Sequence, residues 1–233
     1  MRHGLLLPLL SVLLLAGCGA PRSASSGSCD CQQTVRVPDK AFRTFLVDKG
    51  YAVKARGNRL KPTAEGCALT ELECYNQGIC SLEGIEMFPQ LQQVTCSDNP
   101  LTVLDLNALP QLERLYCLNV PLQQLMMDSC HHLKRVQLSH TKLQTLDLAP
   151  FPALELLLII FSPLTKIDLS PCASLKELYI RGTEIREVDL RPCPDFWALH
   201  ALDTPLERII VSPEQYDGDL KVSVADTVQV LVM

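Results

Sequence analysis

The stretch LQQVTCSDNPLTVLDLNALPQ, residues 91–111, sets a pattern of apolar positions that the chain then repeats every 21 residues. A fixed period near 20 residues predicts a solenoid, in which no unit buries its core alone and neighbouring units complete it. A 22-residue unit precedes this run and a weaker unit follows it, so seven units are present, against the minimum of about three for a stable array. The units open at Leu69, Leu91, Leu112, Leu133, Leu154, Leu175 and Phe196.

Each unit places its leucines where a strand would point them inward. The first half reads L-x-x-L-x-(C/L/I), and the period of two within L-x-L directs the apolar side chains to one face. The second half reads L-x-x-L-D-L, as in Leu101, Leu104 and Leu106. This pattern resembles the 21-residue subclass of bacterial leucine-rich repeats over residues 36–216. The resemblance implies a leucine-rich-repeat solenoid, α/β in class by family but mostly β, with a parallel sheet on one face.

The subclass carries an asparagine at the turn after the first strand, and here only Asn99 occupies that position. We therefore expect a mixed ladder of side chains along this turn. The other units place Val120, Thr141, Ser162, Thr183 and Thr204 there.

Segments without the repeat lie on both sides of it. Residues 35–68 predict an N-terminal helical cap in which Pro38 takes an early helix position, Lys49 lies in the last turn and Gly50 ends the helix. Similar proteins often place a D-x-N-x-D-G calcium loop after this helix, but KARGNRLKPTAEG lacks those acids, so we expect no calcium. The repeats run over 69–216, and alternation through LKVSV and TVQVLV predicts a C-terminal strand cap over 217–233. The apolar face of the helix carries Phe42, Phe45 and Leu46.

The first residues, MRHGLLLPLLSVLLLAGC, have the basic start, apolar run and small residues of an export signal. The end of this run resembles the bacterial lipobox, which implies that 1–17 is a lipoprotein signal peptide and that Cys18 is lipidated. The alternative is a plain secretory signal with an incidental cysteine. Residues 18–34 are small and polar and predict a flexible tether. With the repeats, these features resemble a Bacteroidota-type leucine-rich-repeat lipoprotein.

That resemblance implies a lipid-anchored protein of the cell envelope, and we expect the outer membrane. In such lipoproteins an acidic cluster soon after the lipidated cysteine resembles a surface-export address. Here the first acid after Cys18 is Asp30. The side of the membrane, periplasmic or external, therefore stays open.

Most of the eleven cysteines fall in columns of the repeat. Because leucine, isoleucine or phenylalanine fills the same columns in other units, we expect these cysteines to pack as apolar core groups. Apart from Cys18, four cysteines remain; a disulfide among these four is compatible with an oxidising envelope, and the pairing stays open. The core set is Cys74, Cys96, Cys117, Cys130, Cys172 and Cys193; the remaining set is Cys29, Cys31, Cys67 and Cys80.

Sequence motifs for catalysis or metal binding are weak. The sequence has no G-x-S-x-G, H-E-x-x-H or phosphate-binding glycine loop, and Ser139 and His140 should diverge as strand neighbours, so we predict no enzyme and no cofactor. We also expect no metal at Cys130-His131-His132, because adjacent residues on a turn rarely complete a tetrahedral site. The net charge of −5 without a basic patch gives no support for nucleic acid. An aspartate column predicts turn capping in preference to a cation ladder, and consists of Asp105, Asp147, Asp168 and Asp189.

The stretch LELLLIIF, residues 154–161, is apolar even at outward positions. Other units place polar residues such as Gln93, Thr95, Arg135 and Gln137 there. Burying four large apolar side chains is worth roughly 1.5–3 kcal/mol each, so leaving them in water marks an interaction site. We predict a partner-binding surface formed by Tyr116, Leu118, Leu156, Leu158, Ile160, Phe161, Tyr179, Arg181, Trp197, His200 and Leu202.

The predicted function is therefore a membrane-anchored leucine-rich-repeat module that binds a protein partner through its strand face. Two other functions stay open: a self-associating structural protein of the envelope, and a glycan-binding accessory lipoprotein. Two alternatives without a partner also remain, in which the C-terminal segment or the tether covers the patch, or the register is in error.

Overall fold

The computed structural model describes residues 29–233. The predicted export signal and Cys18 lie outside the described residues. Within the described part, no helix is both long and apolar enough to cross a lipid bilayer.

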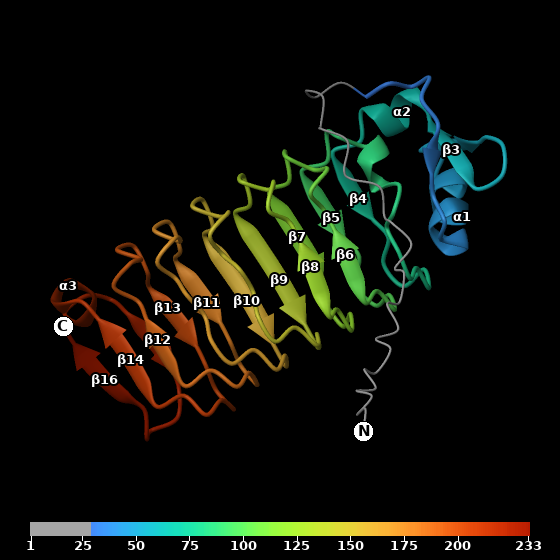
Figure 1. The fold of residues 1–233 in the computed structure, drawn as a ribbon. Coiled ribbons are helices and arrows are strands. Elements are labelled where there is room, and N and C mark those ends of the chain that lie inside the picture. The colour runs from blue at the N-terminus through green and yellow to red at the C-terminus, as the bar shows by residue number, and fades with distance from the viewer. Residues whose placement is uncertain (1–28) are drawn as a thin grey trace, which may run out of the picture.

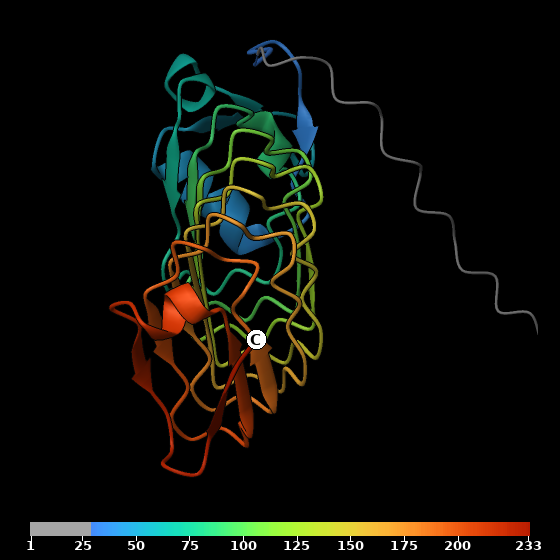
Figure 2. The same ribbon diagram turned by 90° about the vertical axis from the view of Figure 1, so that its left-hand side faces the viewer.

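The chain winds into an elongated parallel β-solenoid (Figure 1), and a view along its axis shows the stacked, flattened coils (Figure 2). One long side of the coils carries an eight-stranded sheet with the order β15-β13-β11-β10-β9-β7-β5-β4, which confirms the predicted solenoid with its parallel sheet. These strands are β4 Glu71–Glu73, β5 Gln93–Thr95, β7 Arg114–Cys117, β9 Arg135–Ser139, β10 Leu156–Ile160, β11 Glu177–Tyr179, β13 Ala198–His200 and β15 Lys221–Ser223.

Strand pairing preserves the period of the sequence. Leu157 of β10 is aligned with Val136 of β9 and with Leu178 of β11, each 21 residues away. All three side chains are fully buried, whereas Leu156 and Leu158 on the same β10 strand are half-buried. The predicted register is thus confirmed, and an error of register is excluded as an explanation of the apolar stretch.

The second halves of the coils form shorter sheets. One has the order β6-β8 and the other β12-β14-β16. The intervening coils contain no strand in this half, although Leu143, Leu148 and Leu164 still point into the core. Leucine burial therefore continues where regular strand pairing stops. The strands are β6 Val103–Asp105, β8 Gln124–Met126, β12 Glu187–Asp189, β14 Arg208–Val211 and β16 Gln229–Val232.

The N-terminal cap contains the predicted helix and several elements that the sequence does not signal. The helix starts at Lys40 because the Asp39 side chain accepts a hydrogen bond from the Phe42 amide, so Pro38 lies just before the helix and not within its first turn. Gly50, with a φ of +77°, follows the helix as expected. The elements are β1 Val35–Arg36, α1 Lys40–Asp48, β2 Ala52–Lys54, β3 Arg59–Pro62, α2 Ala64–Cys67 and the 3-10 turn η1 Ile85–Met87; β1, β3 and β2 form an antiparallel sheet.

At the other end, β15 and β16 extend the two sheets by one further parallel coil, which confirms the two predicted strands. Between β14 and β15, α3 Pro213–Tyr216 starts at a capping box formed by Ser212 and Gln215. As β15 and β16 are edge strands, their inward side chains are only partly covered: Val222, Val230 and Val232 are 38%, 42% and 45% exposed.

The core consists of stacked apolar columns with a polar ladder at the turn after the first strand. The Asn99 amide is buried and donates to the carbonyls of Cys74 and Cys96, at 2.6 and 3.0 Å, and its oxygen accepts from the amides of Gln77 and Ile79. Four later coils use hydroxyls instead, as predicted for a mixed ladder. These bonds run from Thr141 to Ser162, from Thr183 to the Ile180 carbonyl and from Thr204 to the Ala201 carbonyl.

The six column cysteines are free and fully buried, which confirms their prediction as core groups. Burial raises the pKa of the Cys172 thiol to about 11 and of Cys193 to about 12. Cys130 points into the core, where its thiol lies 3.4 Å from the Leu106 carbonyl, whereas His131 next to it is exposed. The Cys130-His131-His132 run is therefore divided between the core and the surface.

Candidate functional site

The predicted binding surface lies on the outer face of the eight-stranded sheet. Cross-strand pairing aligns Tyr116, Gln137 and Leu158, and continues from Leu158 to Tyr179 and His200. Neighbouring members of this row are about 4.8 Å apart, the spacing of paired strands. Side chains from five coils thus form one continuous row across the sheet.

The structure gathers nine of the predicted residues on β10, β11, β13 and the residues directly before or after these strands. Tyr116 and Leu118 lie on and after β7, and the polar strand β9 separates them from the rest. We refer to the nine residues as the strand-face patch. They are Leu156, Leu158, Ile160, Phe161, Tyr179, Arg181, Trp197, His200 and Leu202.

Three members of the strand-face patch are strongly exposed for apolar side chains: Phe161 by 41%, Trp197 by 40% and Leu202 by 44%. The three outward aliphatic residues of β10 are half-buried because side chains of the neighbouring strands flank them. Among the described residues, neither the C-terminal segment nor residues 29–34 lie over this patch: the first pairs at the sheet edge and the second contacts the cap.

Phe161 has an unusual backbone conformation. Its φ is +51°, in the left-handed region that costs an ordinary residue about 1–2 kcal/mol. The equivalent turn position of other coils carries residues that tolerate this conformation more readily, or histidine. A bulky aromatic residue held there is the kind of strain that accumulates at functional sites. The other residues at this position are Asn76, Asp98, Asn119, His140, Gly182 and Asp203.

The neighbouring coils are built around the Phe161 ring. A Cβ on Gly182 would lie only 2.6 Å from Cδ1 of Phe161, so the absence of a side chain there leaves room for the ring. The His140 ring lies on the other neighbouring coil, 4.9 Å from the Phe161 ring centre. The Arg181 guanidinium carbon lies 5.6 Å from the same centre, within cation–π range. Phe161 is therefore fixed in place while remaining exposed.

Tyr179 and His200 form a stacked pair of rings. Their ring centres are 4.5 Å apart and their planes differ by 6°. The Tyr179 hydroxyl donates a 2.9 Å hydrogen bond to Glu177, and this bond raises the pKa of Tyr179 above its ordinary value. On the same side, Lys221 Nζ lies 5.4 Å from the Trp197 ring centre.

Ion pairs border the strand-face patch. Glu155 and Lys176 pair at 3.5 Å at the beginning of the strands, and Arg181 and Asp203 pair at 2.7 Å at their ends. Exposed pairs of this kind contribute only about 0–1 kcal/mol to stability. Their position gives the patch an apolar centre and a charged rim, the usual arrangement of a protein interface.

The Asp column caps turns, as predicted. Each carboxylate accepts a hydrogen bond from the backbone amide two residues later, and in Asp168 the Ser170 hydroxyl adds a second bond that, with the amide, lowers the Asp168 pKa. The pairs are Asp105 with Asn107, Asp147 with Ala149, Asp168 with Ser170 and Asp189 with Arg191.

Ser139 and His140 are engaged separately. The Ser139 hydroxyl accepts a 3.0 Å hydrogen bond from the Asn119 backbone amide, while the His140 ring packs against the Phe161 ring. The two side chains therefore diverge, as expected of strand neighbours.

Several contributors were missed by reasoning from the sequence: His140, Gly182, Lys221, Glu177 and Asp203. His140 and Gly182 share the turn position of Phe161, so a column comparison at that turn could have linked the three. The other contacts depend on side-chain rotamers that the repeat pattern does not encode.

Two surface hollows, of about 700 and 450 Å³, lie outside the strand-face patch, one against α1 and one beside β8.

The chain is similar to solved leucine-rich-repeat structures along most of its length. It shares 17% identity with the functional domain of InlJ from Listeria monocytogenes, which includes a cysteine ladder, with a TM-score of 0.54 over 84% of this chain and 62% of that one. For internalin C2 of the same organism the identity is 20% and the TM-score 0.54, over 84% and 94%. For a leucine-rich-repeat protein of Leptospira interrogans the identity is 18% and the TM-score 0.52, over 64% of this chain and 46% of that one.

The TM-scores show a shared fold, and they confirm the predicted leucine-rich-repeat solenoid. The chain spans less than two thirds of the InlJ domain and of the Leptospira protein. No protein-family model matches the sequence, and a search of curated protein sequences finds no relative.

Proposed function

We propose that this protein is a lipid-anchored leucine-rich-repeat module of the bacterial cell envelope that binds a protein partner through the strand-face patch. The observation that carries this proposal is Phe161, an exposed aromatic side chain held in left-handed backbone beside three outward aliphatic residues of β10. The fold does not require apolar residues at the outward strand positions, because other coils carry Thr95 and Gln137 there.

The composition of the patch favours a protein ligand. Aromatic residues and arginine around an aliphatic centre are enriched at the energetically dominant points of interfaces. Phe161 and Tyr179 each pack against a neighbouring ring, and Trp197 lies within cation–π range of Lys221, so little side-chain entropy is lost when these residues bind a partner. A pre-ordered surface of this kind suits binding rather than catalysis.

The anchor part of the proposal rests on the sequence of residues 1–18. Lipidation at Cys18 would leave ten residues before Cys29, the first residue that the structure describes. Ten residues span at most about 35 Å when extended. The module would therefore act close to a membrane, which we infer to be the outer membrane of a Bacteroidota-type envelope.

Affinity capture from envelope extract tests the binding surface. The bait is the full chain, beside a Leu158→Asp/Ile160→Asp double variant and a matched Val103→Asp control. Val103 is 44% exposed on β6, in the other half of its coil, so the control introduces an aspartate at an exposed apolar position outside the patch. Thermal unfolding of all three baits verifies that the fold is unchanged.

A protein that the parent and the control retain, and the double variant loses, would be purified and its direct binding measured with the same three baits. Equal recovery on the double variant would refute the strand-face patch as the binding site. Sedimentation of the parent at several concentrations tests self-association: a dimer that only the double variant loses would replace the foreign partner with a second copy of this chain.

A further inference from the structure

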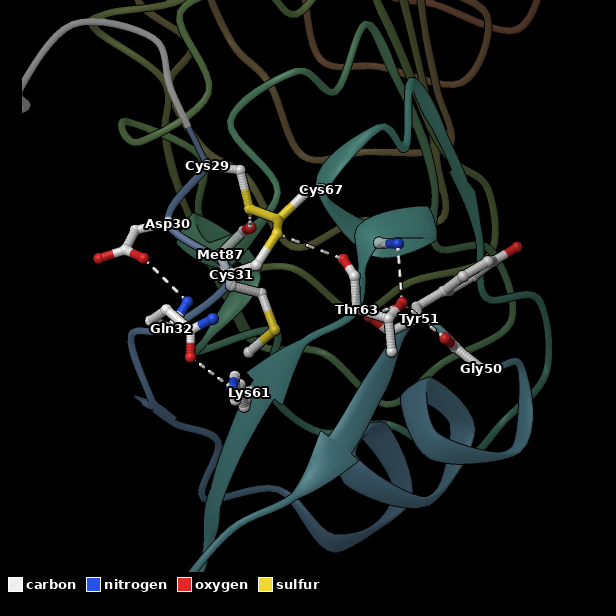
Figure 3. Close-up of a disulfide and its surroundings, with 11 residues drawn as sticks. Cys29, Asp30, Cys31, Gln32, Gly50, Tyr51, Lys61, Thr63, Cys67 and Met87 are labelled. Atoms are coloured by element: carbon white, nitrogen blue, oxygen red, sulfur yellow. Dashed lines mark hydrogen bonds between the residues drawn. A yellow bond between two sulfur atoms is a disulfide. The ribbon is translucent and has the colours of Figure 1, made fainter.

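Three cysteine sulfurs meet at the edge of the N-terminal cap. The sulfurs of Cys29, Cys31 and Cys67 all lie within 4.8 Å of one another, and each residue is half-buried. The structure joins Cys67 to Cys29 and also to Cys31. Because a sulfur forms one disulfide at a time, these are alternative bonds that share Cys67. Figure 3 shows the three side chains converging beside α2.

The backbone permits either bond. The Cα atoms of Cys67 and Cys29 are 5.3 Å apart and those of Cys67 and Cys31 are 6.7 Å apart. Both separations fall within the range of roughly 4.4–6.8 Å seen in disulfides. Asp30 forms the turn between the two cysteines, since its carboxylate accepts from the Gln32 amide at 2.8 Å and its carbonyl accepts from the Gln33 amide at 3.0 Å.

Non-covalent contacts hold the same segment against the cap whichever bond is present. Lys61 Nζ donates to Gln32 Oε1 at 2.8 Å, and Arg59 Nε donates to Thr34 Oγ1 at 2.8 Å. Residues 29–34, which the sequence assigns to the tether, are thus docked on the β3 strand. A change of disulfide partner therefore requires movement of side chains and not release of the segment.

We propose that this cluster is a thiol–disulfide exchange site with Cys67 as its central sulfur. In the Cys29–Cys67 form, the Cys31 thiolate attacks the Cys67 sulfur. A Cys31–Cys67 bond forms as the Cys29–Cys67 bond breaks, and the electron pair leaves on the Cys29 sulfur, which takes up the proton. The step changes no oxidation state and is the general mechanism of disulfide exchange.

The oxidised cluster always retains one thiol beside its disulfide. That thiol can attack an external disulfide, of a small molecule or of an exported protein, to give a mixed disulfide and release one external thiol. The cluster itself is oxidised by the same class of reagent: two protein thiols and one external disulfide give the internal disulfide and two external thiols. The substrate class is therefore thiols and disulfides of an oxidising compartment.

A metal ion is the competing occupant of three thiols. Structural zinc sites use four protein ligands, and this group supplies three. Disulfide chemistry is thus the better account of the geometry.

The test uses the full chain with Cys18→Ala and Cys80→Ser, which removes the other cysteines outside the core. After equilibration with oxidised glutathione at pH 8, the folded protein is labelled with N-ethylmaleimide and digested with a protease that cleaves before aspartate. Cleavage before Asp30 separates Cys29 from Cys31, so mass spectrometry reports each label and each disulfide. Added Cys29→Ser or Cys31→Ser gives two single-pair controls.

We expect one label per molecule, found on Cys29 in some molecules and on Cys31 in others, and a disulfide to Cys67 in both single-pair controls. Labelling confined to one cysteine, or a single-pair control that stays reduced while the parent is oxidised, would overturn the exchange site. Protection of all three thiols that is reversed by a chelator would also overturn it, in favour of a metal site.

Discussion

The ring of Phe161 occupies the space in front of Gly182, where a Cβ would lie 2.6 Å from the ring and 3.5 Å from the Phe161 Cα. The two residues are 21 positions apart in the sequence and occupy the same turn position of adjacent coils. The absence of a side chain at Gly182 thus determines where the exposed Phe161 ring of the previous coil can lie. The position of Phe161 in the strand-face patch therefore depends on a residue of the next coil.

Replacement of Gly182 by alanine should therefore displace the Phe161 ring. We expect a loss of roughly 2–3 kcal/mol in the free energy of unfolding, because the new methyl group meets both the left-handed backbone and the ring. Urea unfolding measures the loss. Gly57→Ala is the matched control: its φ is +68° and no atom lies within 4 Å of the added Cβ, so it should lose only about 1 kcal/mol. Equal losses in the two variants would mean that the ring is free to move.

Adjacent residues of β10 should respond in opposite ways to the same substitution. Leu157 is fully buried, so Leu157→Asp places an unpaired carboxylate in the core and should unfold the protein. Leu158→Asp places it on the strand face and should change the free energy of unfolding by less than about 1 kcal/mol. Circular dichroism with urea unfolding separates the two outcomes. Unfolding of the Leu158 variant would contradict the outward position of that side chain.

The Asn99 ladder should be a major local contribution to stability. Asn99→Ala leaves the amides of Gln77 and Ile79 and nearby carbonyls without their buried partner, and we expect a loss of about 2–4 kcal/mol. Thr183→Val is the comparison, because Thr183 is equally buried but donates only to the Ile180 carbonyl; its loss should be about 1 kcal/mol. Similar losses measured by urea unfolding would refute a special role for the asparagine.

Buried thiols should make the protein less stable at alkaline pH. Folding raises the pKa of Cys172 to about 11, and of Cys130 and Cys193 to about 12, from a reference value of 9.0. The unfolded chain therefore loses these protons first as the pH rises. The contribution to stability is complete below about pH 9 and falls above it, by up to about 1.4 kcal/mol per pH unit for each thiol, until the folded-state pKa is reached.

Urea unfolding between pH 7 and 11 measures this dependence. A variant with valine at Cys130, Cys172 and Cys193 serves as the control, because lysine and tyrosine titrate equally in both proteins. The parent should lose stability more steeply than the variant above pH 9. Parallel curves would show that the thiols are not the cause.

The period of 21 residues predicted the solenoid, the strand face and the inward cysteines because each depends only on which side of a strand a residue occupies. The cap hairpin β2–β3 and the helix α2 do not repeat, and their conformation depends on contacts such as Gly66 against the Tyr51 carbonyl. The patch was predicted by alternation along β10. The contacts that hold Phe161 lie at a turn, where backbone conformation and not alternation decides the direction of a side chain.

The two ends of the solenoid differ in how well they are closed, and this gives the molecule a direction of unfolding. The core at the first coils is covered by α1 and the cap sheet, whereas Val222, Val230 and Val232 of the last coil remain partly in water. In an array whose coils contact only their neighbours, opening should start at the weaker end and proceed coil by coil. Amide exchange should then be fastest at β15 and β16 and slow progressively toward β10. A partner bound across β10, β11 and β13 would contact coils that open at different rates. Its binding would therefore slow this opening as well as occupy the surface.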